Sequence, residues 1–291
     1  MARKKNLVFE TQSRSDRGNT RRFWIILTVS VLAVLLVSVA YILKNNDYDV
    51  NAAFGFEKET ETTEAPSEAE TNVFEAERYF LLFCVDNDKQ KVHFMSLVRT
   101  ELPECRVTVC AIDPYAVLET TAGGSETAAS VYAKSGERAL VSSLEKAYGI
   151  DIDRYVGTDE TDFKTFINSF GGMKITVPEQ IEYKTPEMSL VLIKGNQNLK
   201  GDTMFKYMRY LNSLGSEGKR RQSAAMLEIL GGVFRQSNLN SRSRIFSRIT
   251  NNMMTDMSIV DFSQEENGII MLMQNGILQP ETVEYPEDFD R

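Results

Sequence analysis

The sequence ALVSSLEKAYGIDIDRYVGTDETDFKTFINSFGGMKITVP, residues 139–178, contains two helical patterns followed by an extended one. In the first pattern, Leu140, Leu144 and Tyr148 recur at the spacing of one helix face. Gly149 follows directly, and glycine is common just after the last turn of a helix. The first part of the stretch therefore predicts an amphipathic helix that ends at Gly149.

The second helical pattern repeats this arrangement and passes into a strand. Its spaced apolar residues are Phe163, Phe166, Ile167 and Phe170, and Gly171-Gly172 ends it. Met173–Val177 then alternates apolar and polar residues, which is typical of a strand. The aromatic residues are core by spacing, and the lining of an apolar cavity would leave the same pattern.

Three strands are expected before this stretch. Tyr79–Val85 is a continuous apolar run, as in a strand buried on both faces, and Val92–Val98 and Arg106–Ile112 resemble it. Strands and helices in this order predict an α/β domain with a central mixed sheet flanked by helices in an α-β-α arrangement. The domain should span residues 78–286, with 287–291 as a tail.

The C-terminal half should be mainly helical. We expect a short helix over residues 202–210, a loop through Gly215 and Gly218, and a longer helix from about Lys219. A last helix is expected near residues 265–274.

One transmembrane helix should precede the domain. Residues 23–43 are 21 uncharged, mostly apolar residues, enough to cross a bilayer core of about 30 Å. Residues 1–22 form a basic tail, which favours a cytoplasmic N-terminus and an extracytoplasmic domain at the cell membrane. Residues 44–77 are acidic and poor in apolar residues, which predicts a disordered linker. A cleaved signal peptide is the alternative, although its apolar region is usually shorter.

The net charge of the chain argues against a nucleic-acid partner. The net charge is −8, while residues 1–43 carry seven Lys/Arg against two acidic residues. The rest of the chain therefore carries −13, and such a body lacks the basic face that nucleic-acid binding requires. The three cysteines and the single histidine form no spacing typical of a zinc site.

A family resemblance covers most of the domain. The opening stretch resembles the central signature of the LytR-CpsA-Psr family, also called the cell envelope-related transcriptional attenuator domain. LKGDTMFKYMRY (residues 199–210), RRQSAAM (220–226) and ITNNMMTDMSIVDF (249–262) resemble its later segments in the same order. We therefore interpret the chain as a divergent member.

The resemblance implies an extracytoplasmic phosphotransferase of cell-wall assembly. Such proteins move a glycopolymer from a polyprenyl-diphosphate carrier to peptidoglycan. Arginines would neutralise the diphosphate, a divalent metal such as Mg²⁺ would polarise it, and the prenyl tail would lie in an apolar tunnel between sheet and helices. The implied partners are thus a polyprenyl-diphosphate lipid or a wall glycopolymer.

Carried over by position, the resemblance assigns a partial site. Its implied lipid-diphosphate contacts are Arg209, Arg221, Gln222 and Lys91, and Asp86 is the implied metal ligand. Other charged positions of the family pattern are replaced. Their occupants here are His93, Leu211, Gly215 and Gly218, and the third predicted strand ends in Asp113-Pro114-Tyr115.

These losses favour a protein that binds the lipid or polymer with weakened or lost transferase activity. An active transferase with a relocated charge set is the alternative. A direct transcriptional role has little support, because a cytoplasmic segment of 22 residues is too short for a DNA-binding fold. For single residues, simpler interpretations stay open: Arg209 in a structural salt bridge, His93 as a packed strand residue, and Lys219–Arg221 as a solvated first turn.

Overall fold

The computed structural model describes residues 77–120 and 123–289. The predicted cytoplasmic tail, the membrane anchor and residues 44–76 of the predicted linker lie outside the described residues. In the part of the chain that the structure describes, no helix has the length and apolarity needed to cross a membrane.

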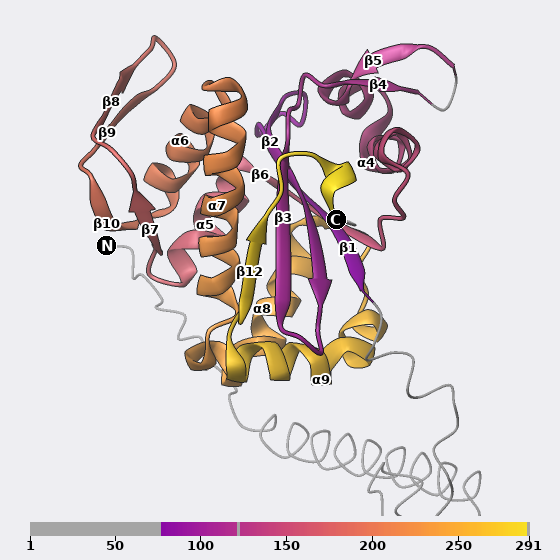
Figure 1. Cartoon of the computed structure of the whole chain (residues 1–291), viewed down its shortest axis with the longest axis vertical. Helices are drawn as coiled ribbons and strands as arrows, with labels where there is room; N and C mark the ends of the chain where they lie inside the picture. Colours follow the sequence, from indigo (N-terminus) through magenta and orange to yellow (C-terminus); the bar gives the residue numbers. More distant parts are fainter. Residues whose placement is uncertain (1–76, 121–122, 290–291) are drawn as a thin grey trace, which may run out of the picture. The chain divides into compact units, whose positions relative to one another are not determined.

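A six-stranded mixed sheet forms the centre of the domain, in the order β11-β6-β1-β2-β3-β12 (Figure 1). Its strands are β1 (Arg78–Val85), β2 (Val92–Glu101), β3 (Arg106–Ile112), β6 (Arg154–Asp159), β11 (Met254–Thr255) and β12 (Gln279–Thr282). Strand β1 is antiparallel to β2 and parallel to β6, and β3 is antiparallel to β2 and parallel to β12. The predicted central mixed sheet is confirmed.

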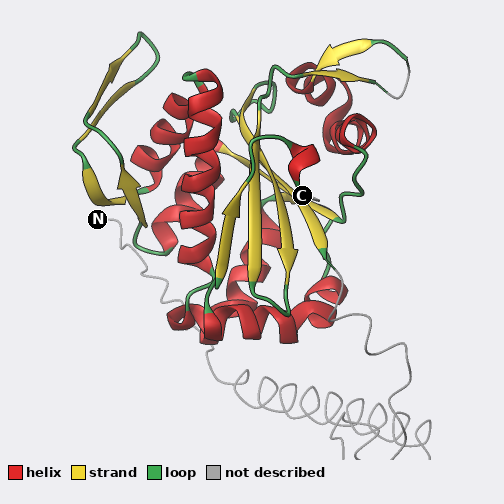
Figure 2. Cartoon of the chain, viewed as in Figure 1, coloured by secondary structure: helices red, strands yellow, loops and turns green. Residues whose placement is uncertain are grey.

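Helices cover both faces of this sheet (Figure 2). Helix α4 (Ala128–Tyr148) packs on the face that carries Leu81 and Leu97. Helices α5 (Glu160–Ser169), α6 (Gly201–Asn212), α7 (Gly215–Val233) and α9 (Ile259–Asn275) contribute to the core on the opposite face. Helix α8 (Arg242–Asn252) precedes β11.

Smaller elements complete the domain. Hairpins form between β4 (Val117–Glu119) and β5 (Ser125–Thr127) and between β8 (Ile181–Lys184) and β9 (Ser189–Leu192). Strand β7 (Met173–Val177) pairs with β10 (Gly195–Leu199) and not with the central sheet. Short 3₁₀ helices are η1 (Gln236–Ser241) and η2 (Pro286–Asp288).

The register of β1 and β2 determines which side chains meet at each end of the sheet. Arg78 lies opposite Thr100, and Val85 lies opposite Val92. Strand β6 begins beside β1, with Arg154 opposite Phe80. The turn between β1 and β2 therefore lies at one end of the strand pair, and Arg78 lies at the other.

Two sequence expectations need correction. The predicted loop through Gly215 and Gly218 is the first turn of α7, which begins at Gly215. A Cβ atom on Gly218 would lie 1.9 Å from the carbonyl oxygen of Leu211, so glycine lets α7 cross closely over the end of α6. The predicted tail is not free as far as it is described, because Phe289 is buried and packs edge-on against Tyr79.

Candidate functional site

An apolar cavity of about 410 Å³ lies between the sheet and its helices. The sheet contributes Phe80 and Leu82 from β1 and Phe94 and Val98 from β2. Helices α5, α7, α8 and α9 supply the opposite wall. A cavity of this size and lining suits a hydrocarbon ligand.

The aromatic residues in and just after α5 fill both roles that the sequence left open. Phe163 and Phe166 line the cavity, and both also contact other rings of the core. Phe170 packs edge-on against Phe166, with ring centroids 5.0 Å apart. The helical spacing could not separate these roles, because a cavity wall and a filled core use the same face of a helix.

An aromatic layer lies between the cavity and Arg209, one of the predicted diphosphate contacts. Phe94, Phe163 and Phe205 form this layer, with centroid distances of 5.3 to 6.4 Å. On its other side, the ring of Phe205 contacts His93 at 5.1 Å and the guanidinium of Arg209 at 5.7 Å. Neither Arg209 nor His93 lines the cavity.

Arg209 is held in an ion pair beside this layer. Its Nη2 lies 2.9 Å from Oε2 of Glu187, a residue of the β8–β9 hairpin. Hydrogen bonding to Arg209 and the nearby charge of Lys91 lower the pKa of Glu187. The structural salt bridge was one interpretation of Arg209 that the sequence left open, and the structure gives Glu187 as the partner. Lys91 and Arg209 thus belong to one electrostatic cluster.

His93 is buried next to these cations and is neutral at pH 7. Its side chain packs on Phe205, and its Nε2 has no hydrogen-bond partner among the described residues. Burial, followed by the positive charges of Arg209 and Lys91, lowers the pKa of His93 from 6.5 to about 4. The interpretation of His93 as a packed strand residue agrees with this environment.

The depressed pKa of His93 predicts a pH-dependent stability. The unfolded chain binds a proton below about pH 6.5 and the folded chain only below about pH 4, so the folding stability falls as the pH drops through this window. His93→Phe should remove up to about 3 kcal/mol of that loss. Denaturant titrations at pH 4 and pH 7 measure it, and an equal pH dependence in variant and wild type would contradict the assignment.

Arg221 and Gln222 lie on α7, and each has its own contacts. Arg221 pairs with Glu179 at 2.6 Å and with Glu217 at 2.9 Å. Gln222 is fully buried, its Nε2 donates to the carbonyl of Met208 at 3.4 Å, and its Oε1 has no partner in the described chain. Because α7 begins at Gly215, these residues lie in its second turn and not at its start.

Asp86, the predicted metal ligand, stabilises the turn between β1 and β2. Oδ1 of Asp86 accepts the backbone N–H groups of Gln90 at 2.7 Å and Lys91 at 3.1 Å. Asp113 similarly accepts the N–H of Tyr115 at 2.9 Å. Among the described residues no three His, Cys, Asp or Glu side chains gather as a metal site. These residues do not fit a bound metal, and the expectation of Mg²⁺ stays a prediction.

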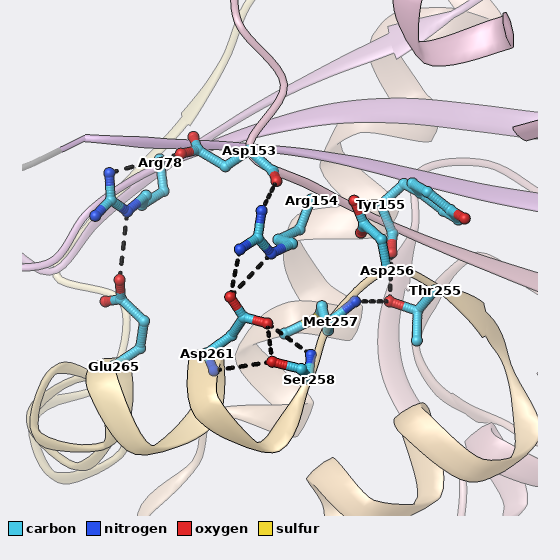
Figure 3. A network of polar contacts seen from close by, with 10 residues as sticks. All are labelled: Arg78, Asp153, Arg154, Tyr155, Thr255, Asp256, Met257, Ser258, Asp261 and Glu265. Carbon is cyan, nitrogen blue, oxygen red and sulfur yellow. Dashed lines mark hydrogen bonds and ion pairs between the residues drawn. The ribbon is translucent and has the colours of Figure 1, made fainter. Parts of the chain in front are cut away.

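The charged residues that line the cavity are different ones, and sequence reasoning missed them. Within the described residues they are Arg78, Asp153, Arg154, Arg242, Asp261 and Glu265. They lie at the start of β1 and β6 and on α8 and α9, and Figure 3 shows five of the six. One available signal was Ser258 three residues before Asp261, because these two form a reciprocal capping box at the start of α9.

Ion pairs join the sheet to α9 at this end of the cavity. Nε of Arg154 donates to Oδ1 of Asp261 at 3.0 Å, and Nε of Arg78 donates to Glu265 at 3.3 Å (Figure 3). The hydrogen bond from Arg154 lowers the pKa of Asp261 to about 2. Both partners of the Arg154–Asp261 pair are therefore charged at any physiological pH.

Comparison with known proteins covers most of the described chain. The sequence model of the LytR_cpsA_psr family matches residues 79–285. The polyisoprenyl-teichoic acid–peptidoglycan teichoic acid transferase TagV of Bacillus subtilis is 26% identical over 147 residues, or 48% of the chain and 38% of TagV. The chain spans 34–44% of the length of this and two further curated relatives.

Solved structures share the fold. The crystal structure of B. subtilis TagV aligns with a TM-score of 0.59 at 18% identity, over 72% of the chain and 85% of TagV. A protein of Eubacterium siraeum described as a transcription regulator aligns with a TM-score of 0.64 at 18% identity, over 77% and 89%. TagT bound to LI-WTA aligns with a TM-score of 0.54 at 17% identity, over 76% and 81%. At such identities the likeness concerns the fold alone.

Proposed function

Since the chain belongs to the LytR-CpsA-Psr family, we propose that it binds a polyprenyl-diphosphate-linked glycopolymer with weakened or lost phosphotransferase activity. We propose that it does so as a membrane-anchored, extracytoplasmic protein of cell-wall assembly, held by residues 23–43. The observation that carries the binding function is the apolar cavity of about 410 Å³ on one face of the sheet.

The prenyl tail would occupy this cavity. Its walls are hydrocarbon and aromatic side chains over most of its length, so burying the tail removes apolar surface from water. The diphosphate would bind beyond the aromatic layer, where Lys91 and Arg209 supply positive charge. Phe94, Phe163 and Phe205 would have to part for the tail to pass between the two regions.

The weak or absent transfer rests on how the cations are held. Arg209 is paired with Glu187, and Arg221 is paired with Glu179 and Glu217. An arginine already engaged by carboxylates stabilises developing phosphate charge less than a free one does. Losing a single preorganised contact of this kind typically costs about 10²–10³ in rate.

The names of relatives support the glycopolymer as ligand. TagV is named a teichoic acid transferase, and TagT has been solved bound to LI-WTA. The acidic body of the chain does not favour a nucleic-acid partner. We propose on this basis that a wall glycopolymer is also the ligand of this chain.

Filling the cavity should weaken binding of the prenyl tail. Ile249 lines the cavity from α8 and is half-buried, so Ile249→Trp places an indole in the space of the tail. We expect about tenfold weaker binding of farnesyl diphosphate, measured by native mass spectrometry on the full-length chain in detergent. Val191→Trp is the matched control, since Val191 is 67% exposed on β9 and does not line the cavity. Equal affinities in both variants would rule out the cavity as the binding site.

A further inference from the structure

Charged side chains at one end of the cavity contact both the cavity and solvent, and we call this group the charged wall. Arg78, Arg154 and Asp261 line the cavity, while 30%, 40% and 16% of their side-chain surfaces stay exposed. Glu265 and Arg242 also line the cavity, and 24% and 28% of their side-chain surfaces are exposed to solvent. Side chains that touch both the cavity and water mark the place where the cavity comes nearest to solvent.

This wall lies far from the proposed diphosphate region. Arg78 begins β1, and Val85 lies beside the turn that carries Asp86 and Lys91. Seven residues of strand at about 3.3 Å each separate the two ends by about 23 Å. A ligand whose head lies near Arg209 therefore directs the end of its tail toward the charged wall.

The wall has a fixed side and a side held by ion pairs. Asp153 is fixed to β1, because its Oδ2 accepts the N–H of Tyr79 at 2.8 Å and its N–H donates to the Tyr79 carbonyl at 2.9 Å. Asp153 in turn pairs with Arg78 at 3.5 Å. On the other side, Asp261 and Glu265 of α9 are held by Arg154 and Arg78 (Figure 3).

Such pairs hold α9 in place without locking it. Partly exposed ion pairs are individually weak, because water and salt screen them. Two further contacts join α9 to α8, the Arg242–Glu266 pair at 2.7 Å and the stacked rings of Phe246 and Phe262. When its pairs to the sheet are lost, the first half of α9 can move away from β1 and β6, while the buried Leu272 and Met273 keep its second half in the core.

The volume of the cavity limits the length of a tail behind a closed wall. A water molecule takes about 30 Å³ of liquid, and a hydrocarbon group is of similar size, so 410 Å³ holds about fourteen such groups. That corresponds to about three five-carbon isoprene units. A longer polyprenyl chain needs another way out of the cavity.

We propose that the Arg154–Asp261 and Arg78–Glu265 pairs form an ionic latch that sets the length of prenyl tail the cavity holds. This inference rests on the proposed function. With the latch closed, the cavity takes about three isoprene units. With the latch open, a longer tail passes between α9 and the sheet and buries its additional units against the exposed inner face of α9.

The test compares tails of different length on an opened and a closed latch. The probes are farnesyl and geranylgeranyl diphosphate, with three and four isoprene units, and the matching alcohols farnesol and geranylgeraniol. The proteins are the full-length wild type, the double variant Arg78→Met with Arg154→Met, and the control Arg106→Met. Arg106 has a side chain 30% exposed and is paired with Glu101 at 3.1 Å, but it does not line the cavity.

In the wild type and in Arg106→Met, we expect the three-unit and four-unit probes to bind equally. In the double variant, the four-unit probes should bind at least tenfold tighter than the three-unit probes. High salt screens the latch, so the wild type in about 1 M NaCl should shift in the same direction without any substitution. The salt measurement keeps the test valid if the double variant does not fold.

The outcomes separate the latch from the proposed function. The same length dependence in all proteins and at all salt concentrations would overturn the latch. If the alcohols show the expected length dependence but the diphosphates bind no tighter than the alcohols, the latch stands and diphosphate recognition fails. If no prenyl probe binds the wild type, both are overturned.

Discussion

Gly218→Ala should destabilise the fold by about 3 kcal/mol or more. The new Cβ would lie 1.9 Å from the carbonyl oxygen of Leu211 and 2.9 Å from Cβ of Leu214. The first of these contacts is with backbone, so a side-chain rotation cannot relieve it. Helix α7 would have to move away from the end of α6, which would also disturb the buried Gln222. Chemical denaturation followed by circular dichroism measures the effect.

Gly231→Ala in the same helix is the matched control. Outside the adjacent residues and the backbone of its own helix, no atom lies within 4 Å of the Cβ position at Gly231, and Gly231 is exposed. Alanine has a higher helix propensity than glycine, so this variant should be stabilised by up to about 1 kcal/mol. Similar losses of stability in the two variants would contradict the close crossing of α6 and α7.

Arg209→Met should weaken the binding of farnesyl diphosphate by about ten- to a hundredfold. A charge-assisted hydrogen bond contributes about 1.5–3 kcal/mol, and each 1.4 kcal/mol changes the affinity tenfold. Methionine keeps an apolar side chain at this position but removes the guanidinium, which lies 5.7 Å from the centre of the Phe205 ring. Binding of farnesol, which has no diphosphate, should stay unchanged. Competition binding with both ligands on the full-length chain measures the difference.

Two further variants distinguish a specific contact from general surface charge. Arg220→Met removes an arginine from α7 that is 69% exposed and paired with Glu217, and it should leave both affinities unchanged. Glu187→Gln removes the carboxylate that holds Arg209, so it should tighten diphosphate binding severalfold. An equal loss of diphosphate binding in Arg220→Met and Arg209→Met would show that only net charge matters.

Much of the fold was predictable from local patterns. Continuous apolar runs located the strands Arg78–Val85, Val92–Glu101 and Arg106–Ile112 to within three residues at each end. Gly149, with φ of 68°, ends α4 as the glycine position predicted. The pairing of Met173–Val177 with β10 was not predictable, because alternation identifies a strand but not its partner.

The site was less accessible to sequence reasoning, since its members come from distant segments. Arg209 on α6 meets Glu187 in the β8–β9 loop, 22 residues earlier, and Arg154 meets Asp261, 107 residues later. Charged residues in loops and at helix starts carry no periodic signal that identifies such partners. Only the fold brings the latch residues together, because it packs α9 beside the start of β6.

The replaced charges also have a structural explanation that the sequence alone did not provide. Leu211 is fully buried, and Gly218 contacts the carbonyl of Leu211 closely. Two of the positions where the family resemblance expects charge, 211 and 218, are here part of a packed crossing between α6 and α7. An arginine at position 211 would be buried in this core without water, at a large cost in stability. Restoring the charge set would thus require remodelling both helices.

The most direct test of a ligand-binding protein without transfer is a single-turnover assay. The full-length chain in lipid nanodiscs would be mixed with a labelled polyprenyl-diphosphate-linked glycan, peptidoglycan and Mg²⁺, and bound and transferred label would be measured together. We predict that the label is retained on the wild type, is lost from Arg209→Met, and does not appear in peptidoglycan. Transfer that depends on Arg209 would contradict this account and identify an active transferase, and the absence of bound label on the wild type would contradict it as well.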